Sequence, residues 1–302
     1  MKQRVITGIL MGVILIPILI LGGWFVTGLV TILAYIACFE LISMYLTKNN
    51  IPTICKYVIP LFSSLIVIGS GIGNLTDVVY ILLVELMCLL VLPIFNKQIK
   101  SKDIIFFIFA IIYSGVSFTL VNEIRNLNVL LNSSIEYKLF EVLDIHLVGL
   151  IMCCYVLIIT MFTDIFAYQF GIKFGKHKLC PTISPKKSVE GAIAGTIFGA
   201  FGGTILMVVL QLVLKETDAK ALLLFNIDNI YLYGILMFLI SLLISVAGQL
   251  GDLIASKIKR EHDIKDYGKI FPGHGGVLDR FDSSIYTFLV FYIILMIIGV
   301  IG

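Results

Sequence analysis

Charged residues are scarce in this chain of 302 residues: they make up 14% of it, while hydrophobic residues make up 59%. Soluble domains usually hold roughly 45–50% apolar residues and about 25% charged ones. With a mean hydropathy of +1.07, a chain of this length could not hide its apolar surface in a soluble core. The composition therefore excludes a soluble globular protein and indicates a protein that lies in a lipid bilayer. The net charge of +3 is small, and no nucleic-acid partner is expected.

Cysteine and histidine patterns that build metal sites are also lacking. The six cysteines form no C-x-x-C pair, and most lie in apolar runs, where free cysteine behaves as a small hydrophobe. The four histidines do not have the paired spacing of a zinc site. No small-residue cleavage site follows the first apolar run, so we interpret that run as a retained span and not as a signal peptide.

Long apolar runs are what the chain does contain. A helix needs about 20 apolar residues to cross a bilayer, and only helices pair all their backbone groups there. This length predicts an all-α polytopic membrane protein with about nine spans. They are expected near 5–22, 24–46, 57–73, 78–95, 104–121, 147–170, 191–214, 230–251 and 283–301. We expect three regions: N-terminal spans (1–121), an outer polar loop (122–146) and a C-terminal catalytic region (147–302).

The basic residues predict the orientation of these spans. With the N-terminus in the cytoplasm, most of the 22 Lys and Arg fall in cytoplasmic segments, as the positive-inside rule requires. The outer loops hold only Arg125, Lys138, Lys215 and Lys220. We therefore expect the N-terminus inside and the C-terminus outside. The expected location is the cell's inner (plasma) membrane, with the polar loops described below facing the cytoplasm.

Two acidic residues and one glycine ridge stand out inside the spans. Glu40 and Glu85 are ionisable groups within apolar runs, which makes them functional suspects; we favour interhelical hydrogen bonding as their role. Glycines recur every four residues at 191, 195, 199 and 203. Such a ridge lets helices approach closely in lipid. It indicates either the interior of a bundle or a contact in a homodimer.

One stretch, residues 256–282, concentrates charges of both signs around a glycine-rich turn. On a helix leaving the eighth span, Asp252, Ser256, Lys259 and Arg260 would share a face. Asp279 and Asp282, three residues apart, would open the ninth span. Carboxylates and phosphates are the oxygen ligands that Mg²⁺ prefers. Anionic lipid would explain the lysines, but not three aspartates at helix ends.

A second polar segment on the same side of the membrane runs from Thr163 to Gly191 and includes Ser184, Lys186 and Lys187. A lipid-headgroup anchor would explain this loop alone. Because both loops lie on one membrane face, we expect them to share a site.

The pattern of residues 256–282 resembles the signature of the phosphatidate cytidylyltransferase (CDP-diacylglycerol synthase) family. That pattern is S-x-x-K-R, four residues, K-D-x-G, then P-x-H-G-G-x-x-D-R-x-D. The matching residues are Ser256, Lys259, Arg260, Lys265, Asp266, Gly268, Pro272, His274, Gly275, Gly276, Asp279, Arg280 and Asp282. Asp164 and the Ser184–Lys187 run are similar to the family as well. The resemblance covers roughly residues 146–302.

The resemblance implies an Mg²⁺-dependent enzyme that condenses CTP with phosphatidic acid in the bilayer to give CDP-diacylglycerol and pyrophosphate. The implied metal ligands are Asp252, Asp279 and Asp282, and a second metal or a monovalent ion is left open. Ser256, Lys259, Arg260 and Arg280 complete the expected catalytic group. The expected substrate-binding residues are Ser184, Lys186, Lys187, Lys265, Asp266, Gly273, His274, Gly275 and Gly276.

Two other functions stay open at this point. A related CTP-dependent enzyme would act on a polyprenol or an ether lipid. A transporter would instead need charged residues near the middle of its spans and broken helices. The acids of the signature are expected at helix ends, which favours the enzyme.

Overall fold

The computed structural model describes residues 2–73, 75–127, 146–214, 227, 229–271, 273 and 275–298. Within these residues, eight helices are long and apolar enough to cross a membrane, which confirms the all-α polytopic fold. The first expected span coincides with a further apolar helix, described with its side chains over Leu10–Leu21. A ninth crossing and the orientation of the termini stay predictions.

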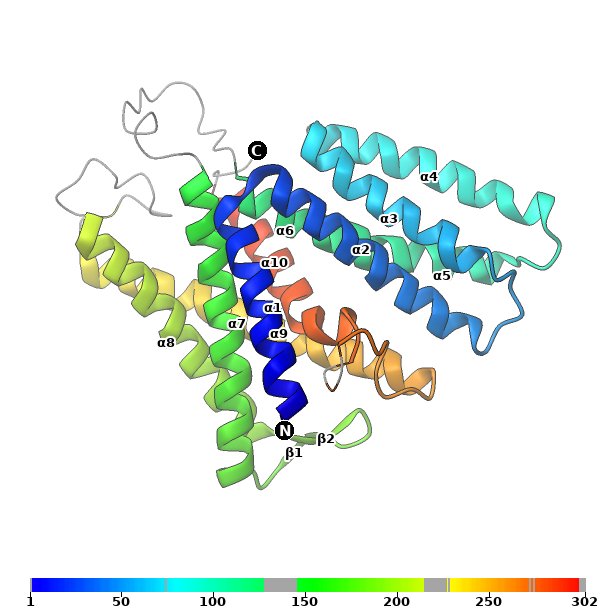
Figure 1. The fold of residues 1–302 in the computed structure, drawn as a ribbon. Helices are drawn as coiled ribbons and strands as arrows, with labels where there is room; N and C mark the ends of the chain where they lie inside the picture. Colours follow the sequence, from blue (N-terminus) through cyan, green and yellow to red (C-terminus); the bar gives the residue numbers. More distant parts are fainter. Residues whose placement is uncertain are drawn as a thin grey trace. The chain divides into compact units, whose positions relative to one another are not determined.

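The helices follow the predicted spans closely (Figure 1). They are α1 (Lys2–Leu21), α2 (Gly23–Leu46), α3 (Cys55–Ile72), α4 (Leu75–Phe95), α5 (Ser101–Ile111), the π-helix η1 (Ile112–Val116), α6 (Ser117–Arg125), α7 (His146–Phe174), α8 (Val189–Leu214), α9 (Ile230–Glu261) and α10 (Leu278–Ile297). An antiparallel pair, β1 (Lys178–Cys180) and β2 (Ser184–Ser188), separates α7 from α8. Residues 122–125, expected in the outer loop, instead end α6.

The chain divides into two compact units. The first unit holds residues 1–126 together with 258–281, and the second holds residues 127–257 together with 282–302. The boundaries therefore fall inside α9 and α10, so the signature stretch contributes to both units. Its larger part, Ile258–Phe281, belongs with the N-terminal helices.

Small polar side chains join the helices of the first unit. Asn122 on α6 accepts a hydrogen bond from Thr27 on α2 at 2.9 Å and donates one to Ser70 on α3 at 3.1 Å. Beside η1, the hydroxyls of Ser63 and Ser114 lie 2.9 Å apart. In lipid the polar groups of a helix have no water to bond with, so such pairs fix how the helices pack.

Arg125 closes the end of α1 within this unit. Its side chain is fully buried, and its guanidinium donates to the carbonyl oxygens of Leu19 and Ile20 at 2.5 and 3.0 Å. These carbonyls lie in the last turn of α1, where intrahelical donors run out. The missing side chain of Gly22 leaves room for the guanidinium, because a Cβ there would lie 2.7 Å from it. Arg125, counted above as an outer-loop charge, is thus a helix cap.

The glycine ridge of α8 lies in the interior of the second unit. A Cβ at Gly195 would come within 2.7 Å of the Thr163 carbonyl oxygen on α7, and Gly191 and Gly203 face the same helix. The hydroxyls of Thr163 and Ser245 lie 2.6 Å apart, joining α7 to α9. The ridge therefore serves packing inside the bundle, and a homodimer remains a prediction without support from it.

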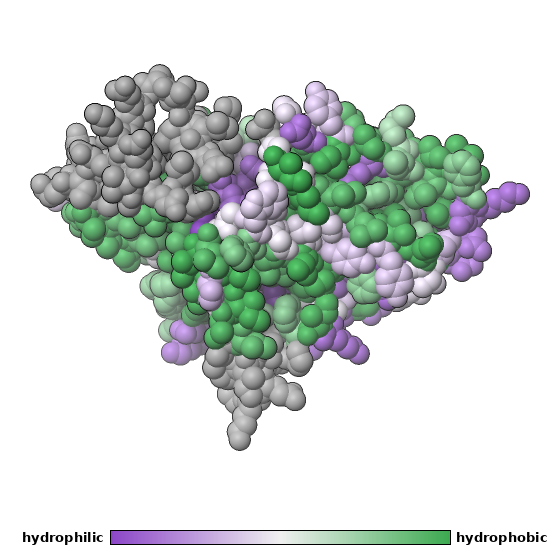
Figure 2. Space-filling view, turned by 45° about the horizontal axis from the view of Figure 1, so that its top comes forward, coloured by the Kyte–Doolittle hydropathy of each residue, from purple (hydrophilic) through white to green (hydrophobic). Residues whose placement is uncertain are grey.

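Apolar side chains cover much of the outer surface. Phe95, Ile94 and Ile297 are each more than three-quarters exposed, and Figure 2 shows broad hydrophobic areas on one face, interrupted by hydrophilic ones. Exposed apolar surface on this scale marks contact with lipid. The few polar residues of the spans, by contrast, are mostly buried against one another.

We expect Gly199→Ala to lower the thermal unfolding midpoint of the purified protein in detergent. The added methyl group would overlap the Thr163 hydroxyl and lie 3.0 Å from that of Ser245, and overpacking of this kind costs about 1–3 kcal/mol. Gly28→Ala on α2 is the matched control, because its methyl group would meet nothing within 4 Å. Equal midpoints for the two variants would contradict the interior position of the ridge.

Candidate functional site

The signature stretch runs from the end of one helix to the start of another. α9 continues to Glu261, ten residues past the predicted end of its span, and α10 begins at Leu278, five residues before the predicted start. Asp252, Ser256 and Lys259 thus lie on α9, while Asp279 and Asp282 lie near the start of α10. Asp279 and Asp282 therefore lie at a helix start, as predicted, whereas Asp252 lies inside α9, well before its end at Glu261.

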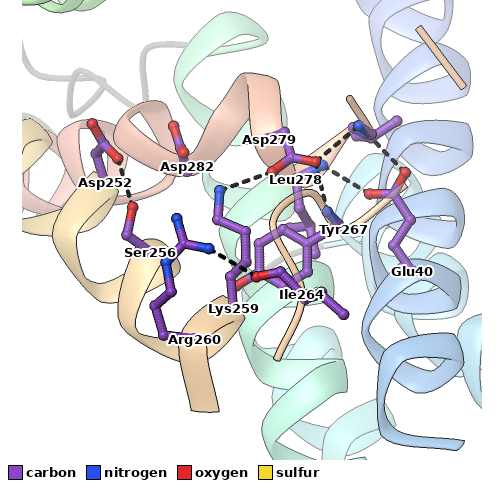
Figure 3. A network of polar contacts seen from close by, with 12 residues as sticks. Glu40, Asp252, Ser256, Lys259, Arg260, Ile264, Tyr267, Leu278, Asp279 and Asp282 are labelled. Carbon is purple, nitrogen blue, oxygen red and sulfur yellow. Dashed lines mark hydrogen bonds and ion pairs between the residues drawn. The ribbon is translucent and has the colours of Figure 1, made fainter. Parts of the chain in front are cut away.

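Asp279 is held by three donors within the first unit (Figure 3). Its Oδ1 accepts a hydrogen bond from Lys259 Nζ at 2.8 Å, and its Oδ2 accepts the backbone N–H groups of Tyr267 at 2.7 Å and Gly276 at 2.9 Å. The side chains of the ion pair are only 10% (Lys259) and 4% (Asp279) exposed. The Lys259 ammonium also lies 5.2 Å from the centre of the Tyr267 ring. Asp279 therefore organises the loop in front of α10.

Glu40, in the N-terminal half of the chain, accepts hydrogen bonds at the start of α10 (Figure 3). Its two carboxylate oxygens accept the backbone N–H groups of Val277 at 2.9 Å and Leu278 at 3.0 Å. The first N–H groups of a helix have no intrahelical acceptor, and a carboxylate there also suits the positive end of the helix dipole. Glu40 is therefore a structural acceptor, as predicted, although its partners are backbone groups of the signature loop.

The glycine-rich turn is a closed loop. Phe271 N donates to Gly275 O at 2.9 Å across the turn, and Gly273 and Gly275 have positive φ values of 78° and 87°, a conformation that favours glycine. The N–H of Gly276 is already donated to Asp279, so contacts with an anion fall to the other glycines. His274, predicted to bind substrate, lies outside the described residues.

The loop after α9 is anchored to the segment that follows α2. Lys48 forms an ion pair with Asp263 and donates to the carbonyl oxygen of Glu261 at 3.0 Å. The pKa of the Asp263 carboxyl is lowered mainly by the hydrogen bond from Lys48 and, to a smaller extent, by the positive charge of Lys48.

The predicted cations of this loop differ in their environment. Arg260 is exposed and donates to Ile264 O at 3.1 Å, whereas Lys259 is buried. The side chains of Lys265, Asp266 and Arg280 are exposed. The exposed cations are therefore the ones that can reach a soluble anion.

In the second unit, the strand β2 brings one of its two lysines to α9. Lys187 forms an ion pair with Asp252, whose other oxygen accepts a hydrogen bond from Ser256 at 3.3 Å. The side chains of the pair are about one-third exposed, at 30% and 27%. Lys186 is exposed and Ser184 half-buried. The second polar loop therefore contacts α9 at Asp252 through Lys187, and a site shared by the two polar loops stays a prediction.

The three predicted metal ligands, Asp252, Asp279 and Asp282, do not form one cluster among the described residues. Among the residues that the structure describes, no group of three or more His, Cys, Asp or Glu could hold a metal ion. Within the second unit, α9 and α10 approach closely, since a Cβ on Gly251 would lie 2.7 Å from the carbonyl oxygen of Asp282. Asp252 and Asp282 belong to these two helix segments. Mg²⁺ usually needs only one or two carboxylates besides phosphates and water, so a group of three acids is not required to hold it, and the predicted metal site stays a prediction.

Sequence reasoning did not foresee that the N-terminal half would hold the signature loop. The available signal was an acid within an apolar span, and it singled out both Glu40 and Glu85. For Glu85 the predicted interhelical hydrogen bond is wrong: in the described part of the chain neither carboxylate oxygen has a hydrogen-bond partner. The span pattern alone does not separate the two cases.

Comparison with known proteins covers both halves of the chain. The model of the cytidylyltransferase family matches residues 2–298. The chain is 34% identical to phosphatidate cytidylyltransferase of Bacillus subtilis over 98% of this chain and 97% of the relative. It is 32% identical to the protein of the same name from Staphylococcus saprophyticus, over 98% and 99% of the two chains, and 31% identical to that of Staphylococcus aureus over the same shares. The similarity thus extends well beyond residues 146–302.

We expect Asp279→Asn to lower the thermal unfolding midpoint of the detergent-purified protein more than Asp282→Asn does. An asparagine amide would place an NH₂ group against the Lys259 ammonium or a backbone N–H. Removing one partner of a buried ion pair costs about 3–5 kcal/mol. Asp282 is a matched control because it lies one turn along the same helix and its Oδ1 accepts the N–H of Ser283 next to it at 2.8 Å. A larger loss for Asp282→Asn would refute the structural role of Asp279.

Proposed function

The chain belongs to the cytidylyltransferase family, and we propose that it catalyses the reaction for which its relatives are named. It transfers the cytidylyl group of CTP to phosphatidic acid, giving CDP-diacylglycerol and pyrophosphate for phospholipid synthesis. The observation that carries this proposal is the signature between Ser256 and Asp282, with its cations and carboxylates at the ends of two membrane helices. The relatives at 31–34% identity over nearly the whole chain support the same substrate pair.

The reaction depends on stabilising negative charge rather than on a strong general base. A phosphate oxygen of phosphatidic acid attacks the α-phosphorus of CTP. The bond from that phosphorus to the bridging oxygen breaks, and pyrophosphate leaves with the electron pair. The attacking phosphate monoester is already anionic near neutral pH. Catalysis therefore lies in holding two polyanions in line and in stabilising the charge of the leaving group.

The accessible cations supply that stabilisation. Arg260, Lys265 and Arg280 are exposed around the signature loop, and Lys186 is exposed on β2. Their guanidinium and ammonium groups bind the CTP phosphates or the lipid phosphate, with the arginines suited to bidentate contacts. Lys187 is paired with Asp252 in this structure, and it exchanges that carboxylate for a phosphate when the nucleotide binds.

Other signature residues position these groups. Ser256 orients the Asp252 carboxylate through its hydrogen bond. Gly273 and Gly275 give the turn a backbone that a nucleotide can approach closely. Lys259 and Asp279 form the buried pair that fixes the loop, so their part in catalysis is to hold Arg280 and the turn in place. Asp266 is an exposed acid at the edge of the same loop.

Asp252 and Asp282 are the residues that would hold Mg²⁺ together with the phosphates. When bound, the ion neutralises phosphate charge and favours departure of pyrophosphate. Asp279, predicted as a third ligand, already accepts three hydrogen bonds, and its carboxylate is better explained as the organiser of the loop.

The protein is a multi-pass membrane protein, and we place its polar loops on the cytoplasmic face of the inner membrane. The distribution of Lys and Arg supports this orientation. CTP is dissolved in the cytoplasm and phosphatidic acid is a bilayer lipid, so both substrates reach helix ends on that face. An ether-lipid phosphate would use the same chemistry, whereas a polyprenol would attack CTP through its hydroxyl group. Only a direct comparison of acceptors separates these substrates.

We expect purified protein in detergent to convert CTP labelled in its cytosine ring into a chloroform-soluble product when both Mg²⁺ and phosphatidic acid are present. Omission of either should reduce conversion to the background of the Asp282→Asn variant. A dolichyl-type polyprenol, tested with CTP labelled in its γ-phosphate, and an archaeal ether-lipid phosphate serve as parallel acceptors. Conversion with one of these alone would overturn phosphatidic acid as the substrate. Ion uptake into liposomes without CTP consumption would favour a transporter instead.

A further inference from the structure

We propose that Glu40 is a positioning residue for the cytidylyl transfer: from α2, it sets the place at which α10 and the signature loop begin. This inference rests on the proposed function, because the reaction supplies its readout. Glu40 lies about 220 residues before the signature and in a span otherwise distinguished only by its apolar character.

The contacts of Glu40 are directed at the backbone. Both carboxylate oxygens are used, one on Val277 N and the other on Leu278 N. The residue is only 3% exposed, so water does not compete for these bonds. Asp279 and Arg280 follow directly in the sequence, and any shift of residues 277 and 278 moves both.

Two glycines of the loop lie so close to the Glu40 carboxylate that neither position has space for a side chain. A Cβ added at Gly268 or at Gly276 would overlap the Glu40 carboxylate. The loop therefore approaches Glu40 at two places, once after Tyr267 and once before Val277. The two glycines and the acid form one packed unit, which explains why a side chain is missing at each position.

Neighbouring contacts anchor the same loop to the same helix. The segment just beyond α2 holds Lys48, which pairs with Asp263, and the rings of Tyr45 and His262 lie 6.3 Å apart. Glu40 acts at the far end of the loop from these contacts. The loop is thus fixed at both ends by α2 and by the segment after it, and Glu40 is the part of α2 that bonds to the backbone at the start of α10.

The geometry also explains why an acid is used. Two N–H groups point at the side chain, and only a carboxylate offers two acceptor oxygens. Glutamine would keep one bond and turn an NH₂ group toward the other N–H. A misplacement of about 1 Å in a group that binds a reacting phosphate can cost about 100-fold in rate, so the loss should appear in turnover.

The test compares Glu40→Ala and Glu40→Gln with the wild-type protein in the CTP and phosphatidic acid assay. We expect kcat to fall at least about tenfold for Glu40→Ala and by an intermediate factor for Glu40→Gln, with both KM values within about threefold of the wild type. Glu85→Gln is the matched control: Glu85 is a similarly buried acid of the same unit, 4% exposed, and we expect its kcat to be unchanged.

The outcomes separate the inference from the proposed function. If the wild-type protein does not transfer cytidylyl groups, the proposed function fails. If it does, and a folded Glu40→Ala variant keeps the wild-type kcat, the positioning role is refuted. Should Glu40→Ala not be recovered in folded form, Glu40→Gln decides, because a wild-type kcat there has the same meaning.

A second pair of variants tests the packing directly. Gly268→Ala should lower kcat because its methyl group displaces the Glu40 carboxylate, and Glu40→Asp should lower it by withdrawing that carboxylate. Shortening the acid also makes room for the methyl group, so the double variant should lose less than the product of the two single losses. Strictly multiplicative losses would contradict direct contact between the two residues.

Discussion

The two hydrogen bonds from Val277 and Leu278 to Glu40 are the contacts on which the arrangement of the signature loop depends. They join the backbone at the start of α10 to α2, inside a unit made of the N-terminal helices and residues 258–281. Asp279 then binds Lys259 and two more backbone N–H groups. Two buried carboxylates thereby satisfy four N–H groups that an apolar surrounding would leave without partners.

Charged residues are few in this chain, and some of them have more than one role. Asp279 neutralises a buried lysine and orders a turn, and Lys187 connects β2 to α9 through Asp252. Other cations of the signature loop, such as Arg280, are exposed. The match of the family model to residues 2–298 agrees with this arrangement, since the N-terminal helices contribute to the loop and are more than a membrane anchor.

Much of the fold follows from the sequence, because a span length of about 20 apolar residues is set by the bilayer. The helix start that carries Asp279, and the contact of Lys187 with α9, were predictable from spacing and side of the membrane. The position of Asp252 inside α9 was not, because the helix continues beyond the apolar run that marked its span. The partner of Glu40 was not, because a contact between residues 40 and 277 leaves no local pattern in either segment. The ligand set Asp252, Asp279 and Asp282 came from resemblance, and spacing could not reveal that Asp279 is occupied by backbone donors.

Hydrogen exchange at the amides of Val277 and Leu278 tests most directly whether Glu40 holds the start of α10. We expect both amides to be protected in the wild-type protein and to exchange at least about tenfold faster in Glu40→Ala, because an N–H without its acceptor opens more readily. The amide of Phe271, bonded to Gly275 across the turn, should change less. Equal exchange of Val277 and Leu278 in the two proteins would contradict the central role given to Glu40.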